Sequence, residues 1–119
     1  MFNLRAEGRS FRRGRCLVPA TEFFLSTGRG RARSRWRVTM AGEEWFCFAG
    51  VWQPAREDWP EAYAVITVPA GPDLIDLKPR HLAALPRRLW HDWLDDRTPA
   101  GALLGPAAAG TFLVERDGR

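Results

Sequence analysis

Cysteine, histidine and lysine are scarce in this sequence. Its 119 residues include two Cys, two His and a single Lys, whereas Arg occurs seventeen times. Cys16 and Cys47 both lie inside apolar segments, and no spacing of Cys and His is typical of a zinc site. We therefore expect two buried free thiols, as in a cytoplasmic protein, and neither a metal nor another cofactor.

Long hydrophobic runs are also missing. No apolar stretch approaches the roughly 20 residues that a membrane-spanning helix requires, and the first residues lack the pattern of a signal peptide. We therefore expect a cytoplasmic protein that makes no membrane contact. The hydrophobic content of 45% and the six Trp are sufficient for one core, so the length predicts a single domain over residues 1–119.

The charge that is present is distributed unevenly. Residues 1–40 hold ten Arg and two Glu, whereas residues 41–119 hold eight basic and twelve acidic side chains. A basic field on one part of a protein attracts polyanions, of which nucleic acid is the first candidate. The near absence of Lys indicates a GC-rich coding bias, which explains the choice of Arg but not its clustering in one third of the chain.

The segment 15–37 carries most of this charge. Its first half is apolar and rich in β-branched and aromatic residues, which favours a strand, and Thr27-Gly28 favours a turn. Beyond the turn, alternate positions are basic: Arg29, Arg31, Arg33, Arg35 and Arg37. Because alternate residues of a strand share a face, the pattern predicts a β-hairpin with an apolar first arm and five guanidinium groups along its second arm.

This basic arm has two interpretations. Arg35 and Arg37 could contact nucleic acid, or the arginines could solvate an edge strand and so prevent aggregation. Trp36 lies between them on the opposite face, as a stacking platform for a base or as a core side chain beneath a basic surface.

The other elements are predicted from apolar patterns. We expect strands near residues 2–7, 45–52, 63–68, 81–85 and 111–114, a helical turn over 73–77 and a helix over 87–94. The segment 45–52 is apolar on both faces and should lie centrally in its sheet. This order predicts an α+β domain with a mostly antiparallel, barrel-like sheet and one or two short helices.

Several motifs together resemble one family. They are Asn-Leu-Arg-Ala-Glu at 3–7, Arg-Cys-Leu-Val-Pro-Ala at 15–20, Phe-Ala-Gly-Val-Trp at 48–52, Val-Ile-Thr at 65–67, and the segment 80–94 with Leu-Pro at 85–86 and Trp-His-Asp-Trp-Leu at 90–94. In order and spacing they are similar to the SOS response-associated peptidase family. The resemblance covers the chain to about residue 95.

The resemblance implies a role at abasic sites in single-stranded DNA. In this family an N-terminal cysteine captures the ring-opened sugar aldehyde as a thiazolidine, assisted by an Asn, a Glu and a His, while arginines hold the flanking phosphates. By motif position, Asn3 matches the active-site Asn, and Arg5 and Arg80 match phosphate-binding arginines. Thr67 matches a Thr that contacts DNA.

The sequence departs from the family pattern at three places. The chain begins at the Asn motif, so we expect it to lack the family's N-terminal portion with its nucleophilic Cys. The family's Glu falls on Leu25, which cannot transfer a proton, and its His falls on Lys78. Lys78 could donate a proton or attack an aldehyde as an amine, so Asn3 and Lys78 are the catalytic candidates.

Three functions are consistent with these residues. The first is an SRAP-like protein that binds single-stranded DNA, abasic strands included, in the DNA damage response, having lost the cross-linking and peptidase activity. The second is an abasic-site lyase that uses the amine of Lys78 or the α-amino group of Met1. The third is a non-catalytic interaction domain, or the product of a decaying gene, that buries its sheet surface in a homo-oligomer. His81 and His91 lack partners at motif spacing, and we expect them at a surface or interface.

Overall fold

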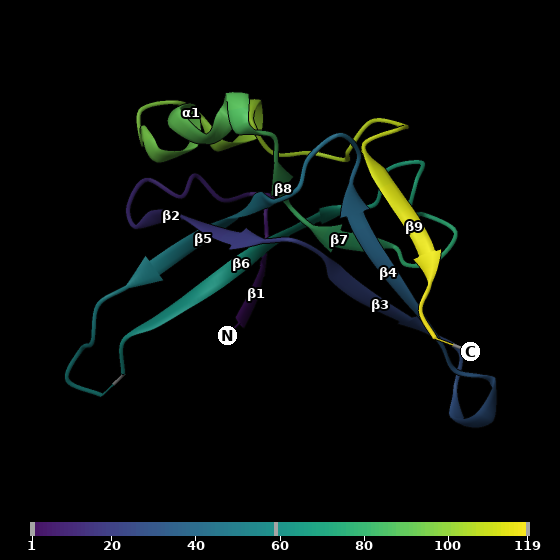
Figure 1. Cartoon of the computed structure of the whole chain (residues 1–119). Helices are drawn as coiled ribbons and strands as arrows, with labels where there is room; N and C mark the ends of the chain where they lie inside the picture. Colours follow the sequence, from purple (N-terminus) through teal and green to yellow (C-terminus); the bar gives the residue numbers. More distant parts are fainter. Residues whose placement is uncertain (1, 59, 119) are drawn as a thin grey trace.

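Two β-sheets packed against each other form the molecule, and the computed structural model describes residues 2–58 and 60–118 (Figure 1). Sheet A has the order β1-β6-β5-β2, with β7 beside β6 and β8 beside β5; its strands are β1 (Phe2–Arg5), β2 (Arg15–Ala20), β5 (Phe46–Gln53), β6 (Ala62–Pro69), β7 (Arg80–Leu82) and β8 (Ala84–Leu85). Sheet B has the order β3-β4-β9, with β3 (Phe23–Thr27), β4 (Ser34–Met40) and β9 (Phe112–Arg116). These sheets confirm the predicted α+β class, with sheet A curled into a half-barrel.

Strand β5 is the centre of sheet A, as its apolar sequence predicts. It pairs with β2, β6 and β8, and its first six residues are buried. Phe46 and Phe48 point into the core between the two sheets, whereas Ala49 and Val51 face the core under the helix.

Aromatic edge-to-face contacts join the two sheets. Phe23 of β3 contacts Phe46 and Phe48 of β5 and Phe112 of β9, with ring centroids 5.5 to 6.3 Å apart. Each buried aromatic ring contributes a few kcal/mol, so these contacts hold sheet B, and with it the β3–β4 hairpin, on sheet A.

The predicted helix over 87–94 is present, with a tighter first half. Arg87–Leu89 forms a 3₁₀ turn, and α1 (Trp90–Leu94) continues it over the face of sheet A. Trp93 is fully buried, and its Nε1 donates a hydrogen bond to the Cys16 carbonyl at 2.9 Å. In the part of the chain that the structure describes, no helix has the length and apolar character that a bilayer crossing needs.

The predicted hairpin over residues 15–37 is wrong in its first arm. Arg15–Ala20 is a separate strand, β2, antiparallel to β5 in sheet A. The chain then crosses to sheet B within two residues, and the hairpin consists of β3 and β4 alone, with Thr27 opposite Ser34. Both halves of the predicted arm are apolar, so the residue pattern did not reveal that they serve different sheets.

Sheet A also contains one parallel pair that brings distant segments together. β1 runs parallel to β6, with Asn3 opposite Val65 and Arg5 opposite Thr67. On the other side of this part of β6 lies β7, with Thr67 opposite Leu82. The residues after β1 and those of β7 therefore meet at the Thr67 end of β6.

Candidate nucleic-acid interface

A groove of about 350 Å³ opens between the two sheets. Asn3 of β1, Thr67 of β6 and Arg80 of β7 line it from sheet A, and Lys78 lines it from the turn before β7. Leu25 of β3 lines it from sheet B. The fold thus collects in one place four residues that the sequence predicts to be functional, together with Leu25, which the sequence resemblance matches to a Glu.

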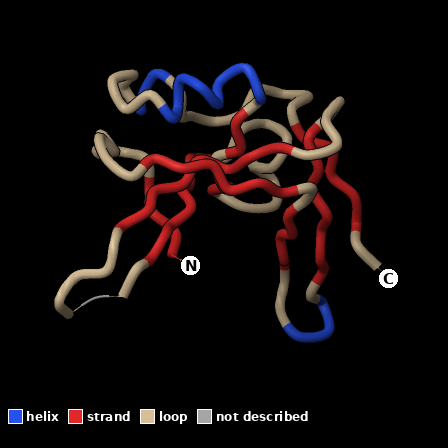
Figure 2. The backbone as a smooth tube through the Cα atoms, turned by 60° about the vertical axis from the view of Figure 1, so that its left-hand side comes forward, coloured by secondary structure: helices blue, strands red, loops and turns tan. Residues whose placement is uncertain are grey.

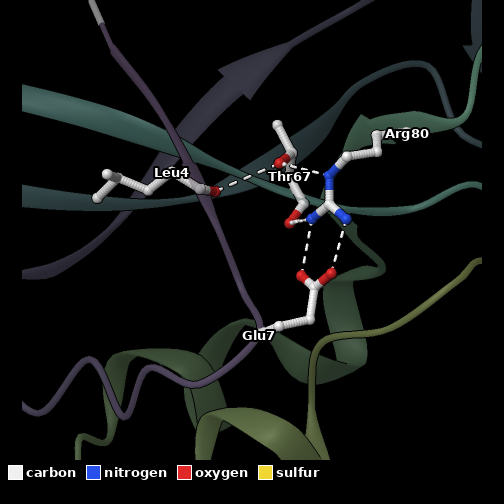
Figure 3. Close-up of polar contacts among 4 residues, drawn as sticks. All are labelled: Leu4, Glu7, Thr67 and Arg80. Atoms are coloured by element: carbon white, nitrogen blue, oxygen red, sulfur yellow. Dashed lines mark hydrogen bonds and ion pairs between the residues drawn. The ribbon is translucent and has the colours of Figure 1, made fainter.

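Arg80 is held at the end of this groove by four hydrogen bonds. Its Nη1 and Nη2 each donate to one carboxylate oxygen of Glu7 at 2.7 Å, which is a bidentate ion pair (Figure 3). Its Nε donates to Thr67 Oγ1 at 3.2 Å, and Nη2 also donates to the Thr67 carbonyl at 2.9 Å. The Thr67 hydroxyl in turn donates to the Leu4 carbonyl at 3.4 Å, so the network ties β7 to β6 and β1.

The electrostatics of this pair keep both groups charged. The Arg80 hydrogen bonds lower the pKa of Glu7 from its ordinary value to about 2, and Glu7 in turn raises the pKa of Arg80. A phosphate can reach the Arg80 fork only by displacing this carboxylate. Glu7 was missed as a site residue, although it ends the 3–7 motif, because its partner lies 73 positions away in the sequence.

Arg5 lies next to this network but outside the groove lining. Its residue is exposed on β1, opposite Thr67 in the strand register. No described carboxylate forms an ion pair with Arg5, and its charge adds to that of Arg80 in lowering the pKa of Glu7. Arg5 therefore supplies positive charge that no ion pair with a described residue compensates.

Lys78 is the one amine among the described residues that line the groove. It follows the predicted helical turn, whose hydrogen bonds include one from the Lys78 backbone N–H to the Leu74 carbonyl at 3.0 Å. Lys78 is half-buried, and its side chain makes no ion pair with a described residue. An amine in this setting can attract a phosphate or, when neutral, attack a carbonyl.

His81 lies in the core, so the prediction of a surface position is wrong. The residue is 4% exposed, because it pairs with Val68 across β6 and β7 and its ring packs edge-on against Phe112. Its Nδ1 lies 2.8 Å from the Leu82 carbonyl, and Nε2 has no described partner. Burial lowers the pKa of His81, so the neutral ring is favoured. His91, in contrast, is exposed.

The arginines of the hairpin do not form the predicted single stripe. Only Arg35 and Arg37 lie on β4, while Gly30–Ala32 forms a 3₁₀ turn that carries the preceding arginines around the tip. Arg35 pairs with Asp117 at 3.4 Å and lies over the Phe24 ring, 3.8 Å from its centroid. Arg37 lies 3.5 Å from Glu22 and 3.6 Å from Glu115. The two strand arginines are therefore paired with carboxylates of sheet B and of the residues that flank it.

Trp36 is half-buried on the other face of β4. Its Nε1 donates to Thr27 Oγ1 across the hairpin at 3.0 Å. This contact agrees with a structural side chain under the basic face, which was one of its two interpretations, and it fixes the two arms where the turn begins.

The cysteines are free and lie away from the groove lining. Cys47 is buried and Cys16 is half-buried, and burial raises the pKa of both thiols. Over residues 2–58 and 60–118, no group of three or more His, Cys, Asp or Glu is arranged to hold a metal ion.

Comparisons with known proteins give a family and a fold. The model of the family described as SOS response associated peptidase (SRAP) matches residues 5–113. Among curated proteins, none matches the sequence.

Solved structures share the fold at low sequence identity. A protein from Bacteroides thetaiotaomicron superposes with a TM-score of 0.82 at 22% identity, over 96% of this chain and 57% of its own. A protein from Bordetella bronchiseptica gives 0.79 at 22% identity, over 98% and 65%. A phage-related protein from the same organism gives 0.71 at 23% identity, over 100% and 64%. The chain thus spans 57% to 65% of the length of these relatives.

Proposed function

The chain belongs to the SOS response associated peptidase (SRAP) family, and on that premise we propose that it binds single-stranded DNA, abasic strands included, in the DNA damage response without forming a covalent link. The observation that best supports this function is the groove between the sheets. It gathers Asn3, Thr67, Lys78 and Arg80, yet it presents Leu25 where the family has its catalytic Glu. Groups that bind a sugar-phosphate strand are kept, while a group that transfers protons is not.

Positive charge around the groove exceeds negative charge. Lys78 lines the groove, Arg5 is exposed beside it, and neither forms an ion pair with a described residue. Only Arg80 is matched, by Glu7. Because phosphate binding needs charge and hydrogen-bond donors but no reaction, Lys78 and Arg5 can hold a strand in the absence of catalysis.

Arg80 would bind a DNA phosphate by exchanging the Glu7 carboxylate for it. A phosphodiester offers two acceptor oxygens in the same fork geometry as the Glu7 carboxylate, so one anion can replace the other on Nη1 and Nη2. The bond from Nε to Thr67 Oγ1 keeps the guanidinium oriented while this happens. Glu7 has 52% side-chain exposure, so water can solvate its carboxylate once a phosphate has displaced it.

Leu25 makes the proton transfers of the family's reaction unfavourable at this site. It is half-buried, and it lines the groove from the strand opposite Asn3 and Thr67. A hydrocarbon there provides an apolar contact for a sugar or a base but neither accepts nor donates a proton.

Equilibrium binding tests the proposal. Fluorescence anisotropy would compare abasic and intact single-stranded oligonucleotides with wild-type protein at low salt. We expect binding that weakens as salt rises, and a larger loss for Arg5→Gln than for Arg56→Gln, a matched control at an exposed site in the β5–β6 loop. No binding of either oligonucleotide at low salt would exclude the function.

The amine of Lys78, which forms no ion pair with a described residue, favours one alternative, an abasic-site lyase. A neutral Nζ would add to the C1′ aldehyde of the open sugar and lose water to form an imine. Removal of a C2′ proton would then expel the 3′ phosphate, and water would hydrolyse the imine and regenerate the amine. Met1, whose α-amino group is the other amine candidate, lies outside the described residues.

Borohydride reduction distinguishes the two functions. If Lys78 forms an imine, reduction traps a covalent adduct with abasic DNA, and Lys78→Arg, which keeps the charge, removes the adduct but not the binding. If the protein only binds, wild type and Lys78→Arg bind alike and neither is trapped.

A further inference from the structure

Charge compensation along the β3–β4 hairpin ends where the strands end. Within strand β4, Arg35 and Arg37 are paired with carboxylates of sheet B and its flanking residues. At the tip, Arg29, Arg31 and Arg33 are all exposed. No described acidic side chain forms an ion pair with these three, and the one hydrogen bond that their side chains make to a described residue is from Arg33 Nη2 to Ser26 Oγ at 3.4 Å.

The tip has a defined turn that fixes where these side chains start. Gly28 has a φ of +76°, and a Cβ there would lie 2.4 Å from the Ala32 carbonyl oxygen, so the backbone closes on itself at this glycine. Backbone hydrogen bonds from Ala32 to Arg29 at 3.0 Å and from Arg33 to Gly30 at 3.2 Å complete the turn. Three guanidinium groups therefore leave one short loop, which concentrates charge at a point.

The tip is continuous with the groove. Leu25 lines the groove from β3, and β3 leads two residues later into the tip, which projects from the body of the molecule (Figure 2). Gly28, where the turn begins, is three residues from Leu25, so a strand rise of about 3.3 Å per residue puts it on the order of 10 Å from Leu25. The tip arginines lie beyond this point, so a strand that is held in the groove reaches them only if it extends past β3.

We propose that the hairpin tip is a second backbone-binding site, in which Arg29, Arg31 and Arg33 hold phosphates of the same DNA strand beyond the segment in the groove. This inference rests on the proposed function. It differs from a general basic surface because the strand arginines of the same hairpin already have carboxylate partners, whereas the tip arginines do not. The tip is thus the part of the hairpin whose positive charge is available to bind an anionic ligand.

The test combines two oligonucleotide lengths with two triple variants. Arg29→Gln/Arg31→Gln/Arg33→Gln removes the tip charge. Arg13→Gln/Arg56→Gln/Arg88→Gln removes the same formal charge from three exposed sites on separate elements. Binding of a 5-mer and a 20-mer of single-stranded DNA is measured for each protein over a range of salt concentrations.

The expected result separates the tip from the groove. For the 20-mer, the tip variant binds about tenfold more weakly and its log–log salt slope falls by about 2, because each phosphate contact on a single strand contributes about 0.7. For the 5-mer, the difference between the tip variant and the control triple is smaller, because a short strand makes fewer contacts beyond the groove. Equal slopes for the two triples on the 20-mer would overturn the second site and leave groove binding intact, whereas no binding of wild type to either length would exclude the proposed function as well.

Discussion

Arg80 in the groove and Arg31 at the hairpin tip are both cations that we propose to bind DNA phosphates, but their surroundings differ. Arg80 is 18% exposed in its side chain and meets a carboxylate at 2.7 Å on two nitrogens. Arg31 is exposed and has no ion-pair partner among the described residues. One arginine has its ligand position filled by the protein itself, and the other does not.

The number of basic residues in a region therefore does not give the positive charge that is available to bind an anionic partner. The region 1–40 holds ten Arg, but Arg35 and Arg37 have acidic partners and Arg15 donates to four backbone carbonyls, at Ser10, Phe11, Trp93 and Asp95. The proposed DNA binding would therefore use two modes: exchange of one anion for another in the groove, and direct binding of phosphates at the tip.

The largest effect is expected from breaking the tip turn. Gly28→Ala places a methyl group against the Ala32 carbonyl at a positive φ, so we expect a loss of about 3 kcal/mol in the free energy of unfolding. Gly30→Ala is the matched control, since its φ is +55° with open space around it, and should lose about 1 kcal/mol. Urea denaturation measures both, and equal losses would show that the close approach at Gly28 does not define the tip.

The next largest effect concerns the cation in the groove. Arg80→Gln removes the fork that a phosphate would use, and we expect about 30-fold weaker binding to single-stranded DNA because hydrogen bonds to charged groups contribute about 1.5 to 3 kcal/mol. Arg56→Gln, measured by anisotropy under the same conditions, should change binding less than twofold. If Arg80→Gln binds as tightly as wild type, Arg80 serves the fold and not the ligand.

A smaller effect of opposite sign is expected at its partner. Glu7→Gln leaves Arg80 with a neutral neighbour that a phosphate displaces more easily, so DNA affinity should rise about fivefold. Glu61→Gln makes the same change in net charge at an exposed position on another strand connection. An equal gain for the two variants would mean that Glu7 acts only through long-range repulsion.

The smallest effect is the pH dependence of stability that is expected from His81, a buried residue that also contributes to the groove lining. Burial lowers the pKa of His81, so the unfolded state binds its proton more readily, and stability is complete above the unfolded pKa and declines as pH falls through and below it. Between pH 7 and pH 6 the free energy of unfolding should fall by less than about 1 kcal/mol from this residue. His81→Leu should reduce the pH dependence in denaturant titrations, whereas His91→Leu, at an exposed site, should keep it.

Much of the fold could be predicted because its signals are local. The apolar run at 45–52 predicts a central strand, and β5 occupies that place. The segment 87–94, with Pro86 ahead of it, predicts a helix that α1 and its 3₁₀ turn supply.

The remainder depends on contacts between distant residues or on backbone geometry. No local sequence signal indicates that the chain crosses from sheet A to sheet B after Ala20. The arginine spacing predicted strand alternation from residue 29 onward, but the turn at Gly28 and Gly30, both with positive φ, interrupts the strand there. His81 was expected at a surface because its cover, Phe112, comes from the last strand. The Asn3, Lys78 and Arg80 grouping came from the family motifs, whereas the Glu7 pair depends on the parallel β1–β6 pairing, which the sequence did not predict.

Hydrogen–deuterium exchange gives the most direct test of whether DNA binds in the groove and at the hairpin tip, because it maps the segments that DNA covers. The exchange of the free protein would be compared with that of its complex with a 20-mer single-stranded oligonucleotide carrying one abasic site. We expect slower exchange on binding in Phe23–Thr27, in Arg80–Leu82 and around the hairpin tip, and unchanged exchange at residues 54–58 of the β5–β6 loop. Saturated DNA binding that leaves the peptides of the groove and the hairpin unprotected would contradict the account.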